Sequence, residues 1–178
     1  WSSDVCSSDL NLNHLRNHGA AQTAIGEITS YVLPDHTNMT VAANSVVEVD
    51  FSERKRTIHL NRGEVYLDVE HDREHPFVIA VGGDHEVVVT GTKLNVNFDA
   101  SRNAVEVAVL EGRINVNRHT AQPESQEMTA GEVILFPESG APERRNLTPE
   151  QAASWRVRQL YFDDARLPEI LTEINQIG

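Results

Sequence analysis

Apolar and polar residues alternate along the chain between Arg62 and Phe136, and a glycine precedes each alternating segment. The segments read RGEVYLDV, TGTKLNVNF, LEGRINVN and AGEVILF. Side chains on a strand point alternately to the two faces of a sheet, so this pattern predicts short β-strands with one buried face. Glycine adopts backbone conformations that a Cβ atom disfavours, and we therefore expect structural turns at these glycines. They are Gly63, Gly91, Gly112 and Gly131.

Turn signals such as LPDHT, NRG, DREHP, GGD, DASRN and QPES separate the predicted strands. Many short strands divided by turns predict a mainly β domain over residues 25–145, built as a β-solenoid or a β-sandwich, with a barrel also compatible. The more polar residues 11–24 are expected to form a lead-in segment. The predicted inward-facing residues are Val65, Leu67, Val69, Leu94, Val96, Phe98, Val105, Val107 and Val109.

The pattern changes in residues 146–178. Thr148, Pro149 and Gln151 suit the start of a short helix as N-cap, first helical residue and capping-box residue. A short strand containing Leu160 and Phe162 should follow, and then a second helix, which makes a β-α unit that stops early. That strand could accept a strand from a partner protein, with Asp163 and Asp164 beside it, or it could simply close the core.

Composition narrows the possible partners and locations. The formal net charge of −12 argues against a surface that binds the phosphates of nucleic acids or anionic lipids. No run of about 18 apolar residues is present, so the sequence predicts no membrane span. Residues 1–10, WSSDVCSSDL, resemble the translation of a sequencing adapter, and we leave them out of fold reasoning. They contain the only cysteine, Cys6, so a disulfide framework and a thiolate nucleophile are not expected.

The most suggestive chemical motif is HDREH at residues 71–75, which matches the H-x-x-E-H pattern of one class of zinc peptidases. That chemistry needs a helix, whereas Pro76 follows at once and the flanking segments VYLDVE and PFVIAV read as strands. We therefore interpret HDREH as a polar hairpin connection. The pair His14 and His18 is expected to be solvated. No catalytic residue, metal site or cofactor is predicted, and an enzyme is not expected.

Several motifs, taken in order, resemble the periplasmic domain of FecR-type regulators of extracytoplasmic-function sigma factors. They are LPD at Leu33–Asp35, RGEVYLDV, HPFVIAV, VTGTKLNV, VAVLEGRINV and TAGE. The resemblance runs from about Ile25 to Gly131, with a weaker tail to Asn175. The chain departs from the family pattern at His36, which replaces the usual turn glycine of LPDGS.

The resemblance implies a periplasmic signal-relay domain. In such proteins it follows an inner-membrane helix and a cytoplasmic sigma-binding segment, and a β-α element similar to the short domain of secretins and TonB-dependent receptors often comes after it. The partner would be the signalling domain of a TonB-dependent outer-membrane transporter, often one for ferric chelates. The membrane anchor and sigma-binding segment are expected to precede Asn11 and to be missing here. A carbohydrate-binding β domain and a metal-dependent cupin-like enzyme remain as alternatives.

Overall fold

The structure is a computed structural model that describes residues 13–120, 123–146 and 154–157. These residues are almost entirely β, which confirms the predicted fold class. The strands are β1 (Asn13–His14), β2 (His18–Gln22), β3 (Thr29–Val32), β4 (Asn38–Val41), β5 (Val46–Ser52), β6 (Lys55–Asp68), β7 (Phe77–Val81), β8 (His85–Val89), β9 (Lys93–Asp99), β10 (Ala104–Glu111), β11 (Arg113–Arg118), β12 (Glu124–Thr129), β13 (Glu132–Phe136) and β14 (Glu143–Asn146), and one 3-10 helix, η1, spans Ser154–Val157.

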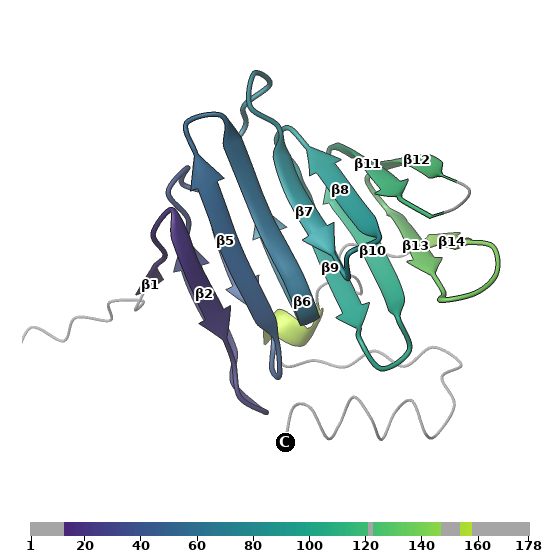
Figure 1. The fold of residues 1–178 in the computed structure, drawn as a ribbon, viewed down its shortest axis with the longest axis horizontal. Coiled ribbons are helices and arrows are strands. Elements are labelled where there is room, and N and C mark those ends of the chain that lie inside the picture. The colour runs from purple at the N-terminus through teal and green to yellow at the C-terminus, as the bar shows by residue number, and fades with distance from the viewer. Residues whose placement is uncertain (1–12, 121–122, 147–153, 158–178) are drawn as a thin grey trace, which may run out of the picture.

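The long strand β6 joins the two layers of the fold (Figure 1). Its first half pairs antiparallel with β5 and parallel with β7, whereas its second half pairs antiparallel with β4 and β9. The change comes at Arg62 and Gly63, where the register with β5 shifts and Gly63 has φ of 87°. The first layer comprises β2, β5, the first half of β6, β7, β8, β11 and β12, and the second layer comprises β1, β3, β4, the second half of β6, β9, β10, β13 and β14.

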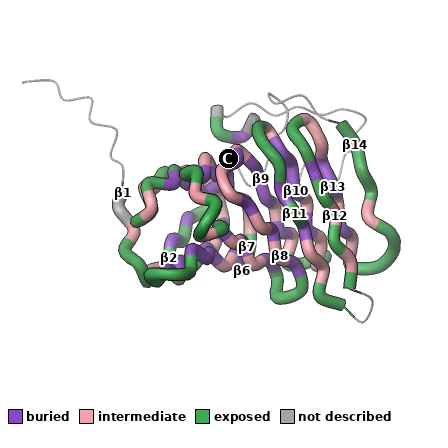
Figure 2. Tube along the Cα trace, turned by 90° about the horizontal axis from the view of Figure 1, so that it is seen from above, coloured by how far each residue is buried: buried purple, intermediate pink, exposed green. Residues whose placement is uncertain are grey.

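One hydrophobic core lies between the two layers. Alternate residues of β5, β6 and β7 from the first layer meet alternate residues of β6, β9 and β10 from the second layer, and Figure 2 shows buried positions recurring along the strands. Every inward-facing residue that the alternation predicts is buried, from Val65 to Val109. Each such side chain contributes about 1.5–3 kcal/mol when it leaves water, so this core is the main source of stability.

The interpretation of HDREH as a hairpin connection was wrong. Strands β6 and β7 pair in parallel, with Arg56 opposite Phe77 and Leu60 opposite Val81. Because β6 carries the chain into the second layer before it ends, the segment after Asp68 must return to the first layer and cannot fold back as a hairpin. The segment is instead a crossover loop.

The carboxy-terminal predictions lie largely outside the described residues. Residues 154–157 form a 3-10 helix, and the short helix expected to begin at Thr148, a position outside the described residues, is not borne out. The strand with Leu160 and Phe162, and the acids Asp163 and Asp164, lie outside the described residues. The domain boundaries stay predictions, although the expected lead-in segment contains β2, which pairs with β5.

Candidate functional site

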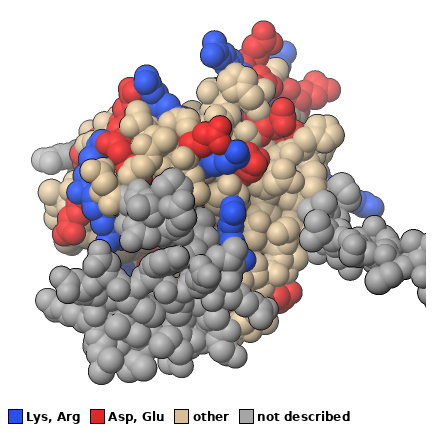
Figure 3. All heavy atoms as spheres, turned by 180° about the vertical axis from the view of Figure 1, so that it is seen from behind, with Lys and Arg blue, Asp and Glu red and all other residues tan. Residues whose placement is uncertain are grey.

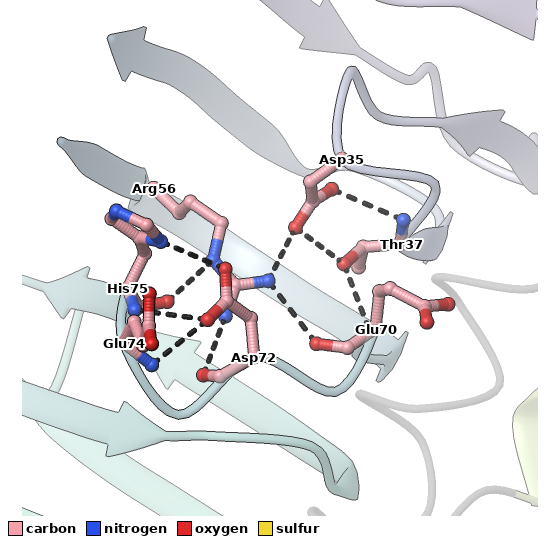
Figure 4. A network of polar contacts seen from close by, with 7 residues as sticks. All are labelled: Asp35, Thr37, Arg56, Glu70, Asp72, Glu74 and His75. Carbon is pink, nitrogen blue, oxygen red and sulfur yellow. Dashed lines mark hydrogen bonds and ion pairs between the residues drawn. The ribbon is translucent and has the colours of Figure 1, made fainter. Parts of the chain in front are cut away.

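A buried arginine, Arg56, forms hydrogen bonds with residues of two loops (Figure 4). Arg56 lies at the start of β6 and is only 7% exposed. Its Nη1 donates to the Asp35 carboxylate at 2.9 Å and to the Glu70 carbonyl at 3.1 Å. Its Nε donates to the His75 carbonyl at 2.7 Å, and its Nη2 donates to the Asp72 carbonyl at 3.3 Å. One guanidinium therefore ties the LPDHT turn and the crossover loop to β6.

The LPDHT turn is closed by its own hydrogen bonds. Asp35 accepts from the backbone N–H of Thr37 at 3.0 Å and from its hydroxyl at 2.8 Å. The Leu33 N–H donates to the Thr37 carbonyl at 2.9 Å. His36 sits in this turn with φ of 70°, the left-handed conformation that glycine adopts most easily. The turn thus forms despite the replacement of glycine by histidine.

The residues of the H-x-x-E-H pattern stabilise the crossover loop. Asp72 accepts from the backbone N–H groups of Glu74 at 2.8 Å and His75 at 3.1 Å, and its carboxylate lies 2.9 Å from Nδ1 of His75. The hydrogen bonds from His75 and Glu74 lower the pKa of Asp72 to about 2. Within the ranges that the structure describes, no three His, Cys, Asp or Glu residues form a group able to hold a metal ion.

A second candidate region lies on the outer face of the second layer, where η1 docks. Trp155 is 9% exposed and packs against Ala42 and Tyr66, separately from the main core. Its Nε1 donates to Oδ1 of Asn95 at 3.0 Å, and Nδ2 of Asn95 donates to the Glu64 carboxylate at 2.6 Å. Asn95 is itself 4% exposed, so its amide is satisfied on both sides by these two partners.

A cation–π contact strengthens the docking of η1. The guanidinium of Arg156 lies 3.7 Å from the centroid of the Tyr66 ring. Such contacts are worth about 0.5–1 kcal/mol at exposed sites. Where grey atoms do not cover this side of the molecule, Figure 3 shows acidic and basic side chains interspersed rather than gathered by sign.

Comparisons with known proteins assign the family. The family model for the FecR protein matches residues 20–115, just over half of the chain. The chain belongs to the FecR family. Two crystal structures, each of a proposed anti-sigma factor from Parabacteroides distasonis, share its fold: the TM-scores are 0.81 and 0.80, at 20% identity in each case, with 90% and 89% of this chain and 74% of each of those chains covered. A search of the curated proteins found no match.

In this FecR domain the four glycines expected at turns all have positive φ, although Gly63 lies within β6 rather than in a turn. The values are 87° for Gly63, 147° for Gly91, 89° for Gly112 and 87° for Gly131. A Cβ at Gly63 would lie 2.1 Å from Oγ of Ser45, and one at Gly91 would lie 2.3 Å from Nδ1 of His71. A Cβ at Gly131 would meet nothing within 4 Å.

Two open grooves lie beside the LPDHT turn of the FecR domain. The smaller, of about 210 Å³, borders the Arg56 network. The larger, of about 620 Å³, is lined by Leu15, Arg16, Asn17, His18, Val32, Leu33, Pro34 and His36. Its lining contains no Trp, Tyr or Phe, the side chains on which sugar rings stack, so it does not support the carbohydrate-binding alternative.

No helix among the described residues is long and apolar enough to cross a bilayer.

Sequence reasoning missed both Arg56 and Trp155. Arg56 occupies an inward position of the alternation that continues through Ile58 and Leu60, and a charged residue at such a position signals a buried ion pair. Trp155 is the only tryptophan after the first residue, and it follows the predicted β domain. Neither pattern reveals the partner residues, since Asp35 and Asn95 come from distant parts of the chain.

Proposed function

We propose that this chain is the periplasmic signal-relay part of a FecR-type regulator of an extracytoplasmic-function sigma factor. Membership of the FecR family supports the regulatory class. The fold shared with the proposed anti-sigma factors agrees with it. The proposed partner is the signalling domain of a TonB-dependent outer-membrane transporter, such as one for ferric chelates. In the full-length protein, a transmembrane helix and a sigma-binding segment would carry the signal inward. We propose neither a catalytic role nor a cofactor.

The docking of η1 is the observation that favours a relay. Trp155 belongs to the segment that follows the β domain, yet its indole is hydrogen-bonded to Asn95 in the centre of the second layer. A partner that engages residues beyond η1 would therefore act on a contact with defined geometry. The residues proposed to meet the partner are Leu160, Phe162, Asp163 and Asp164, which lie outside the described residues.

Direct binding tests this proposal. The 178-residue chain is titrated, by isothermal calorimetry, with each purified signalling domain of the TonB-dependent transporters from the same organism. We expect one of them to bind and the others to bind much more weakly. If none binds, and a sample extended at both ends binds none either, the proposed partner class is wrong.

Charge reversal locates the binding surface. We expect the pair Asp163→Lys and Asp164→Lys to weaken binding about tenfold or more, because rim charges steer association and two reversed charges repel the original partner. The matched control reverses Glu124 and Glu127, which lie on β12 at the far edge of the first layer. Equal affinities for both double variants would refute this placement of the surface.

Substitution of Trp155 tests the relay contact separately. Trp155→Ala removes the indole from the outer face without opening the main core, so the domain should stay folded. Binding of the signalling domain should weaken, because the segment that follows η1 would no longer be anchored to the sheet. Ordering it on binding would then cost more conformational entropy. An unchanged affinity would show that η1 plays no part in the relay.

A further inference from the structure

Strand β2 is an unpaired edge of the first layer. Among the residues that the structure describes, it pairs only with β5, from His18 opposite Asp50 to Gln22 opposite Val46. In the same register, Phe51 N–H donates to the Asn17 carbonyl at 2.7 Å and Thr23 N–H donates to the Ser45 carbonyl at 3.1 Å. The odd-numbered residues of β2 therefore direct their backbone N–H and C=O groups towards β5.

The even-numbered residues of β2 consequently direct their backbone groups away from the sheet. They are His18, Ala20 and Gln22, and all three are exposed. Each presents one N–H and one C=O along a regular strand without a register shift. This row of unpaired donors and acceptors matches what a further antiparallel strand requires.

Two other edge strands among the described residues, β12 and β14, carry the charges that usually prevent such pairing, and the edge strand β1 has only two residues. Edge strand β12 contains Glu124 and Glu127, and β14 contains Glu143 and two arginines and follows Pro142. Strand β2 has the sequence HGAAQ, with no proline, no bulge and no carboxylate or ammonium group. Natural sheets protect edges with such features, so their absence indicates an edge that is covered in the working protein.

We infer that a second copy of this chain covers β2, through antiparallel pairing about a two-fold axis at Ala20. In this register Ala20 lies opposite Ala20 of the partner subunit, and His18 lies opposite the partner's Gln22. All the outward backbone groups of both strands are then paired. The strand is also self-complementary, because the small alanines meet on the axis and no like-charged carboxylates or ammonium groups face each other. The inference goes beyond the proposed function and does not depend on it.

Sedimentation equilibrium tests the dimer. The chain has a mass of 19.8 kDa, and we expect a concentration-dependent rise towards twice that value. Ala20→Lys places two ammonium groups opposite each other on the axis and should raise the dimer dissociation constant about tenfold or more. The matched control is Ala80→Lys on β7, a central strand of the same layer. A sample that stays monomeric at millimolar concentration, or equal effects of both substitutions, would overturn the inference.

Cross-linking tests the register. Directly opposed residues of a hydrogen-bonded antiparallel pair have Cα atoms about 5.5 Å apart, within the range of a disulfide. In a Cys6→Ser background, Ala20→Cys should oxidise to a covalent dimer at least about tenfold faster than Gln22→Cys, which faces the partner's His18 instead of itself. Ala80→Cys serves as the collision control. If Ala20→Cys cross-links no faster than this control, the proposed pairing is wrong.

Discussion

The Arg56 network makes the sharpest prediction about stability. Arg56→Met keeps an unbranched apolar chain against Phe77, on whose ring the guanidinium now lies at 5.7 Å. It removes every hydrogen bond from the guanidinium and leaves the carboxylate of Asp35, which is 13% exposed, without its cation. Breaking a buried ion pair on one side costs about 3–5 kcal/mol.

We expect the cost of breaking the Arg56 network to lie at the lower end of that range, because the network borders open solvent. Asp35, Asp72 and His75 border the open groove of about 210 Å³, so water can reach some of the groups that lose their donor. We therefore expect a loss of about 3 kcal/mol from a total stability of about 5–15 kcal/mol. At a urea slope of about 1.5 kcal/mol per molar, the unfolding midpoint should fall by about 2 M.

Urea unfolding followed by circular dichroism measures this loss, and Lys55→Met is the matched control. Lys55 precedes Arg56 on the same strand, but its ion pair with Asp50 is exposed, so the control should leave the midpoint nearly unchanged. Asp35→Asn combined with Arg56→Met should cost less than the sum of the single changes, because neither partner is then left charged and alone. A loss below about 1 kcal/mol for Arg56→Met would refute this account of the network.

Three further predictions concern backbone strain, pH and the outer face. Gly63→Ala should destabilise the domain by about 2 kcal/mol more than Gly131→Ala, since both have φ of 87° but only Gly63 faces a close neighbour, and equal urea midpoints would contradict this. Burial lowers the pKa of His85, so the free energy of unfolding should keep its full value above pH 6.5 and should fall as the pH drops below 6.5. Urea titrations at several pH values should show a smaller fall for His85→Gln. Trp155→Ala should lower the free energy of unfolding by about 2 kcal/mol, less than Arg56→Met, because the indole lies outside the main core. Urea unfolding followed by near-UV circular dichroism measures this loss.

Much of the fold could be predicted from local pattern. Alternation identified the inward residues of β6, β9 and β10, because a strand with one buried face must place an apolar side chain at every second position. Gly63 likewise marked a special backbone position, with φ of 87°, but the Ser45 side chain that leaves no room for a Cβ there is a distant residue that the tertiary structure places. The absence of helical geometry around HDREH followed from Pro76 and the flanking strands.

The connections between distant segments could not be predicted in this way. Strand β6 reads as an ordinary, if long, run of strand residues, and no local signal says that its halves pair in different layers. That pairing made HDREH a crossover loop rather than a hairpin. The partners of Arg56 lie 14 to 21 residues away in sequence, and Trp155 meets Asn95 across 60 residues.

The sequence by itself determined the β class, the inward faces and the resemblance to the FecR family, because each depends on neighbouring residues or on motifs in order. Only the tertiary structure decided which loops Arg56 holds together, where Trp155 docks and which of the described strands lie at the edges of the sheet. These features depend on strand order, and strand order is set by the burial of a shared core rather than by local conformational preference.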